Sequence, residues 1–177
     1  MMMKTSIKNY FWHAWGILLF ISLCLFIPFY SKMKYGVQSS NLIIDFAWAF
    51  FVIVCVPAIA LYLRYYLLSR NYTVFYSYKC ISFISNCKKR NINVGDISHI
   101  EIKMPIPMYF NGLRFFATDS FLYAVIYTKS KEKFVITSFL DRDLIDTIAF
   151  FKGKVDIKRK PRLLCWPPKN KVNITNN

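Results

Sequence analysis

The sequence predicts an α+β membrane protein, in which a two-helix transmembrane hairpin precedes a small antiparallel β-barrel or sandwich capped by a C-terminal helix. Of the 33 charged residues, only 7 lie in residues 1–70 and 26 lie in residues 71–177. Two long charge-free stretches occupy the first part, whereas apolar and polar residues alternate over much of the second. Because hydrophobic residues make up 55% of the 177-residue chain, a disordered chain is excluded.

The first charge-free stretch is long enough to cross a bilayer. Between Lys8 and Lys32 lie 23 residues without Lys, Arg, Asp or Glu. A helix needs about 20 apolar residues to cross roughly 30 Å of hydrocarbon, and aromatic residues gather at both ends of this stretch, as they do at headgroup level. We expect a span over about residues 10–30, with Pro28 in its last turn. A cleaved signal peptide is the weaker alternative, because no small-residue cleavage site follows.

A second span is expected over about residues 42–68. It contains 18 charge-free residues between Asp45 and Arg64, and Pro57 lies inside it, where it should kink the helix. A soluble domain of this size could not bury two such helices on all sides. Asp45 stands at the mouth of the span, which favours a solvated interfacial residue over an intramembrane functional acid.

The basic residues near the span ends predict the orientation. The N-terminal flank carries two lysines and the connecting loop carries two, whereas the C-terminal flank is clearly more basic. Cytoplasmic flanks carry the excess of Lys and Arg, so we expect both termini in the cytoplasm and the protein in the inner membrane. The residues on the C-terminal flank are Arg64, Arg70, Lys79, Lys88, Lys89 and Arg90.

Residues 71–152 are predicted to form the cytoplasmic domain, between a hairpin over 1–70 and a basic tail over 153–177. Alternating β-branched and aromatic residues indicate short strands, and Lys88-Lys89-Arg90 is interpreted as a turn between two of them. The expected strands cover about residues 72–78, 80–87, 92–94, 97–102, 113–117, 121–128 and 134–139.

A helix is expected over residues 140–152 at the end of this domain. Ser138 and Asp141 have the spacing of a capping box, and apolar residues then recur at helical intervals. Acidic residues stand early and lysines late, which suits the helix dipole, and Gly153 is a suitable stop. The helix is expected to close one opening of the barrel or sandwich.

The order of these elements resembles that of the bacterial pleckstrin-homology-like (PH-like) membrane proteins, which carry two N-terminal transmembrane helices. The resemblance covers about residues 40–152 and includes Val94-Gly95-Asp96-Ile97, a short segment of the type that precedes a central strand in that family. It implies a PH-like fold, and a fold alone does not establish a function. A similar layout occurs in photosystem I assembly factors.

The sequence contains no recognisable catalytic or cofactor motif. P-loop, dinucleotide-binding, zinc-protease and nucleophile-elbow patterns are absent from the sequence. His13 and His99 have no ligand partner at suitable spacing, and Cys80 and Cys87 stand too far apart for the tight pairs of a zinc site. We therefore expect a protein that is not an enzyme and that binds no cofactor or metal.

Basic residues are the candidates for contact with anionic lipid headgroups, because each Lys or Arg near an anionic leaflet contributes about 1 kcal/mol of attraction. The alternative is a solvated tail that only helps to set the topology. Nucleic acid is not expected as a partner, because no stacking platform accompanies the charges. The candidates are Lys88, Lys89, Arg90, Lys152, Lys154, Lys158, Arg159, Lys160 and Arg162.

The segment Met104–Arg114 contains large apolar residues for a loop, namely Met108, Tyr109 and Phe110. It is a candidate for contact with the membrane or a partner protein, and the alternative is that it covers one end of the domain. Taken together, the sequence predicts a non-enzymatic binding or scaffold protein whose partners are the bilayer, anionic headgroups and other membrane proteins. An accessory or assembly subunit of a larger membrane complex is the second interpretation, and a small membrane-embedded enzyme is the third.

Overall fold

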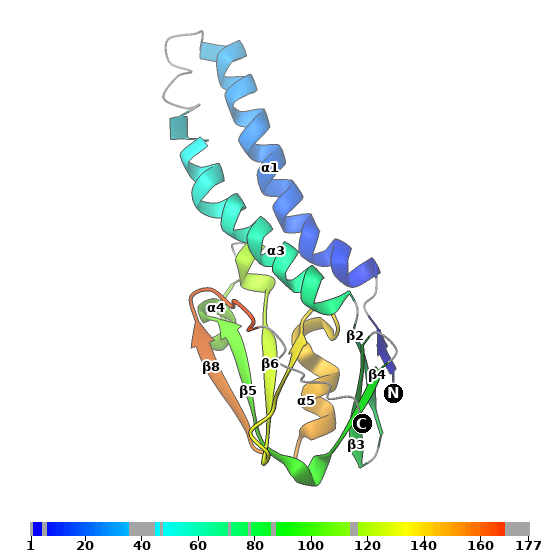
Figure 1. The fold of residues 1–177 in the computed structure, drawn as a ribbon. Helices are drawn as coiled ribbons and strands as arrows, with labels where there is room; N and C mark the ends of the chain where they lie inside the picture. The colour runs from blue at the N-terminus through cyan, green and yellow to red at the C-terminus, as the bar shows by residue number, and fades with distance from the viewer. Residues whose placement is uncertain are drawn as a thin grey trace.

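Two long helices lie side by side and lead into a β-rich domain (Figure 1). The first helix is α1 (Ile7–Tyr35), and the second consists of a π-helical turn η1 (Phe51–Cys55) that continues into α3 (Val56–Ser69). The computed structural model describes residues 2–4, 7–35, 45–46, 48–70, 72–77, 79–85, 88–113 and 117–168.

Both helices are long and apolar enough to cross a membrane, as the sequence predicted. The segments that meet this criterion are Ala14–Lys34 and Trp48–Ser69, each with a mean hydropathy of 2.0. The expectation for Pro28 was wrong in one respect, because α1 continues to Tyr35 and Pro28 therefore lies inside the helix. Lys32 and Lys34 in the last turn interact favourably with the negative end of the helix dipole, which supports this extension.

The irregularity expected at Pro57 takes the form of the π-helical turn. The N–H group of Val56 donates to the carbonyl oxygen of Phe51, five residues earlier, just before the proline begins the regular part of α3. Proline has no N–H group and its ring crowds the preceding turn, so a widened turn before it is the expected accommodation.

The first sheet has the strand order β1–β2–β3–β4. Strands β2 (Tyr72–Tyr76), β3 (Cys80–Ser85) and β4 (Lys88–Asn93) form an antiparallel meander, and the three-residue β1 (Met2–Lys4) adds to its β2 edge. The prediction of a turn at Lys88-Lys89-Arg90 was wrong, because these residues begin β4 and pair with β3.

The second sheet has the order β7–β6–β5–β8. Strands β5 (Ile97–Pro105), β6 (Tyr123–Thr128) and β7 (Lys133–Thr137) are antiparallel, whereas β8 (Ile157–Arg162) pairs in parallel with β5. The sheet is therefore mixed rather than antiparallel throughout. The strand β8 was not predicted, because four of its six residues are charged and it has no alternating pattern.

The two sheets are open in the described part of the chain, so the sandwich alternative describes them better than a closed barrel. Apolar residues from both inner faces form the core between them, for example Ile81, Phe83, Ile100 and Ile126. The short helix α5 completes this core with Phe151. Figure 1 shows α5 between the two sheets.

Helix α5 covers only Ile145–Phe151, which is shorter than the predicted 140–152. Asp143 and Leu144 have φ values of 56° and 54°, so a regular helix cannot begin before Ile145. The cap also differs from the predicted capping box. Asp141 itself accepts hydrogen bonds from the backbone N–H groups of Asp146 and Thr147, at 3.3 and 2.6 Å.

Candidate functional site

The base of the helical hairpin packs on the outer face of the second sheet. Leu61 and Tyr65 of α3 are buried there against Phe121, Val125 and Phe139. The inner face of the same sheet contributes to the sandwich core, so its strands are buried on both sides. The hairpin and the domain thus share a second apolar core, which we call the joint.

Aromatic rings interlock within the joint. Phe139 lies edge-on to Tyr10 of α1 and Tyr62 of α3, with ring centroids 5.2 Å apart in each pair. Tyr65 meets Phe121 at 5.1 Å in the same edge-to-face manner. Such pairs contribute about 0.5–1.5 kcal/mol each beyond the area they bury, so the joint couples both helices to the domain.

Polar contacts fix the segment after β8 to α3. The Tyr65 hydroxyl donates to the carbonyl oxygen of Cys165 at 2.8 Å, and Arg64 donates through Nε and Nη2 to the carbonyl oxygen of Pro167 at 3.3 and 3.2 Å. At the end of α3, the hydroxyls of Ser69 and Thr137 lie 2.5 Å apart in a buried hydrogen bond. The chain beyond the second sheet is therefore held against the hairpin.

Burial raises the pKa of the Cys165 thiol to about 12, although Arg162 opposes the shift. A thiol that stays protonated is a poor nucleophile and a poor metal ligand. Cys165 is therefore suited to packing in the joint rather than to chemistry.

An ionic cluster lies on the outer face of the second sheet, next to the joint. The Glu101 carboxylate pairs with Lys103, 2.6 Å away, and with Lys160 of β8. The side chains of Glu101 and Lys103 are only 10% and 8% exposed, so this is a largely buried ion pair. Tyr127 donates to the same carboxylate at 3.3 Å.

Burial would raise the pKa of Glu101, but hydrogen bonds and charge attraction from Lys103 and Lys160 outweigh it and hold the pKa at about 2. The carboxylate is thus ionised at any physiological pH. A general acid needs the opposite shift, so this cluster is suited to holding β8 against β5 rather than to proton transfer.

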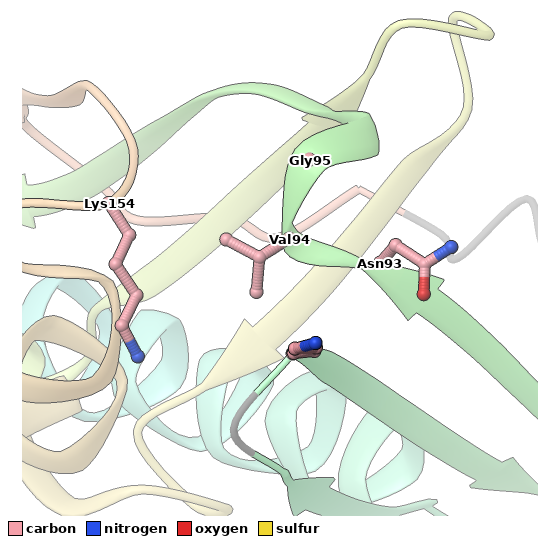
Figure 2. Close-up of a pocket in the computed structure, with 5 residues that line it drawn as sticks. Asn93, Val94, Gly95 and Lys154 are labelled. Carbon is pink, nitrogen blue, oxygen red and sulfur yellow. The ribbon is translucent and has the colours of Figure 1, made fainter.

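A hollow of about 470 Å³ lies at the other end of the domain, at the bend between β4 and β5. Figure 2 shows Lys154 extending into it across from Val94 and Asn93. The Lys154 ammonium group lies 4.2 Å from the centroid of the Phe150 ring. Lys79 also lines the hollow, so its electrostatic preference is for an anion.

A second hollow, of about 360 Å³, opens beside α4 (Ile106–Tyr109). Met104 and Leu122 give it an apolar floor, and Asp143 and Arg159 give it one charge of each sign. A net charge near zero gives this hollow no clear preference for a charged ligand.

The predicted lipid-contact residues do not form one surface. Lys88, Lys89 and Arg90 lie on β4, the edge of the first sheet, and Arg90 pairs with Glu132 at 3.1 Å. Lys152 and Lys154 follow α5, whose C-terminal end lies at the end of the domain away from the hairpin (Figure 1). Lipid contact by any of the nine candidates stays a prediction. The remaining four candidates, Lys158, Arg159, Lys160 and Arg162, lie on β8, the edge of the second sheet.

The predicted loop Met108–Phe110 forms the end of α4 and the turn that follows it. Met108 is half-buried against the sandwich core, whereas Phe110 is 72% exposed. Met108 therefore helps to cover the core of the domain, whereas Phe110 is placed for contact with a membrane or a partner protein.

The described residues contain no group of three or more His, Cys, Asp or Glu side chains that could hold a metal ion. His99 stacks on Tyr127 with centroids 4.5 Å apart. Cys80 is a half-buried free thiol, while Cys87 and the side chain of His13 lie outside the described part.

The sequence analysis missed Arg64 and Tyr65, which join the hairpin to the domain, and Glu101, which holds β8 against β5. One signal was available for the joint: Phe121–Tyr127 is apolar on both alternating faces, which is typical of a strand covered on both sides. Comparison with models of known protein families and with curated proteins finds no match.

Proposed function

We propose that this protein is a membrane-anchored, non-enzymatic binding or scaffold protein that presents a PH-like domain at the cytoplasmic face of the inner membrane. The observation that carries the proposal is the combination of an apolar hairpin with a buried joint that packs the hairpin on the domain. The hairpin exposes large apolar side chains such as Leu25, Phe29 and Ile53, which are 64–72% exposed. Exposure of such a surface to water is unfavourable, whereas contact with lipid is not.

The PH-like assignment is supported by the order of the elements after the hairpin. A meander of three strands is followed by three further antiparallel strands and by α5, which packs between the sheets. Strands β1 and β8 lie outside this PH-like order. They extend the two sheets and connect the domain to the segments before and after it.

The hairpin topology is supported by strand pairing. Strand β1 precedes α1 and pairs with β2, which follows α3, with Met2 opposite Phe75. This pairing supports a hairpin whose two ends lie on the same side of the membrane. The basic residues of the domain favour the cytoplasmic side.

Side-specific labelling tests both the span and the orientation. In a background without the five native cysteines, single cysteines replace Met33, at the far end of α1, and Lys129, in the turn between β6 and β7. In intact cells, an impermeant maleimide should label Met33→Cys and should label Lys129→Cys only after lysis. Labelling of Lys129→Cys from outside would reverse the orientation, and release of the protein by alkaline carbonate would refute the spans.

An accessory or assembly role in a larger membrane complex is the second candidate. Only 12% of the most apolar window of α1 and 22% of that of the second helix are buried within the chain, which leaves most of both surfaces for contact with lipid or other helices. A stable partner that co-purifies in mild detergent, and is lost when Leu25 and Phe29 are replaced by alanine, would favour this role.

A further inference from the structure

Exposed apolar side chains gather at the edge of the domain that lies beside the hairpin. They come from two segments, the α4 turn and the chain after β8. Phe110 and Leu113 are 72% and 73% exposed, and Leu163 is 83% exposed. We call this set the apolar rim, and it comprises Tyr109, Phe110, Leu113, Leu163, Leu164 and Trp166.

The two segments of the rim lie at the hairpin end of the domain. Helix α4 contacts β8 and the 3-10 turn η3 (Ala117–Ser120), and η3 in turn contacts both α1 and α3. Figure 1 shows α4 and the end of β8 together at the hairpin end of the domain, below α3, while the bend between β4 and β5 lies at the opposite end. The two segments of the rim therefore lie at the end of the domain from which the hairpin leaves.

The level of the rim coincides with the expected edge of the hydrocarbon layer. The apolar segment Ala14–Lys34 has 21 residues, which at about 1.5 Å per residue covers the roughly 30 Å of hydrocarbon. Its lower end, Ala14, lines the same small hollow as Tyr62 of α3. Tyr62 is thus level with the boundary that α1 sets. The apolar window of the second helix runs on to Ser69, but its charge-free part ends at Leu63, next to Tyr62, so we take this level as the boundary.

The polar contacts of α3 then place the C-terminal part of the rim at this level. Arg64 and Tyr65 come directly after the boundary and bind the carbonyl oxygens of Pro167 and Cys165. Trp166 stands between these two anchored residues and is 51% exposed. An indole ring at this height has the position that tryptophan favours at a membrane interface.

A basic residue next to the rim also supports a position at the membrane boundary. Arg162 is exposed at the end of β8 that is paired with Pro105, directly before α4, so a cation stands next to the rim. Apolar side chains that enter the boundary, flanked by cations at phosphate level, are typical of interfacial membrane contacts.

We propose that the apolar rim is a second membrane contact, which enters the headgroup boundary of the leaflet beside the hairpin and binds glycerolipid. This inference rests on the proposed function, because the hairpin must bring the rim to the bilayer. The rim and the joint together hold the two sheets upright on the membrane, with the hollow at Lys79 and Lys154 directed away from it.

Spin-label accessibility in lipid nanodiscs tests the proposal on the full chain. Labels are attached to single cysteines that replace Phe110 or Leu163 in the background without native cysteines. Oxygen, which partitions into lipid, should relax these labels more strongly than a water-soluble nickel chelate does. The order should reverse for a label at Lys129, which lies in the turn at the far end of β6.

A label at Leu25 on the hairpin separates the two proposals. If Leu25 is accessible to oxygen while Phe110 and Leu163 behave like Lys129, the hairpin spans the membrane and the rim proposal is overturned. If labels at 110 and 163 are shielded from both reagents, a protein covers the rim and the proposal is again overturned. If Leu25 itself is accessible to nickel, the proposed function fails.

Tryptophan quenching gives a second measurement that leaves the native cysteines in place. The emission lost on Trp166→Phe isolates the signal of Trp166, and lipids brominated near the headgroup end of the acyl chain should quench it. Emission from Trp166 that bromination leaves unchanged would overturn the proposal.

Discussion

The Tyr65 hydroxyl reaches the carbonyl oxygen of Cys165 at 2.8 Å, across 100 residues of sequence. Tyr65 belongs to the apolar second helix, and Cys165 belongs to the segment that follows the last strand. Both side chains are almost fully buried in the joint. The contact shows that the segment after β8 is part of the folded domain and not a free tail up to this point.

Tyr65→Phe should destabilise the joint by about 1–3 kcal/mol, because it leaves the buried carbonyl oxygen of Cys165 without its donor. We expect earlier cleavage after β8 in limited proteolysis of the protein in micelles, and a lower midpoint of thermal unfolding. Tyr66→Phe is the matched control, because Tyr66 is 37% exposed. Equal effects of the two variants would contradict the role given to Tyr65.

Glu101→Gln should cost about 3–5 kcal/mol of folding free energy, because Lys103 would stay buried without its counter-charge. Glu132→Gln is the control, since its pair with Arg90 is exposed and an exposed pair contributes about 1 kcal/mol or less. Denaturant unfolding in a mild detergent measures both changes. A loss from Glu101→Gln no larger than that from Glu132→Gln would show that the cluster does not hold β8.

The stabilisation by Glu101 should depend on pH. Its pKa falls from 4.5 in the unfolded chain to about 2 in the fold, so its contribution is complete above about 4.5 and disappears as the pH falls towards 2. The difference in stability between the wild type and Glu101→Gln should shrink by on the order of 3 kcal/mol over this range. Burial raises the pKa of Asp141 and gives the opposite trend, but both proteins carry Asp141, so its effect cancels. A difference that is constant between pH 7 and pH 3 would contradict the assignment.

The hairpin could be predicted from sequence because its signal is local. Each span is a continuous run of apolar residues, and run length alone meets the requirement of the bilayer. Strands β2, β3, β6 and β7 could be predicted for a similar reason, since β-branched and aromatic residues alternate within each of them.

The strands β4 and β8 could not be predicted, because their pairing partners supply the reason for their conformation. In β4, Lys88, Lys89 and Arg90 look like a solvated turn until their backbone pairs with β3. In β8, Lys160 is stabilised by Glu101, 59 residues earlier, and no local pattern reveals such a pair. The joint was missed for the same reason: Tyr65 lies near the end of an apolar run, and its partners Phe121 and Cys165 are distant in sequence.

Asp141→Ala should destabilise the domain by about 2–3 kcal/mol, because it removes the acceptor for two buried donors. Asp141 accepts from the Thr147 N–H group and the Thr147 hydroxyl, each at 2.6 Å, and this hydroxyl also lies 2.9 Å from that of Tyr76. The change should therefore loosen α5 and its contact with β2 together, which hydrogen exchange of the two segments would detect. Asp156→Ala is the control, since Asp156 is 62% exposed and pairs with Lys158 only at the surface. Faster exchange in α5 alone, with β2 unchanged, would show that the Tyr76 link does not connect the helix to the first sheet.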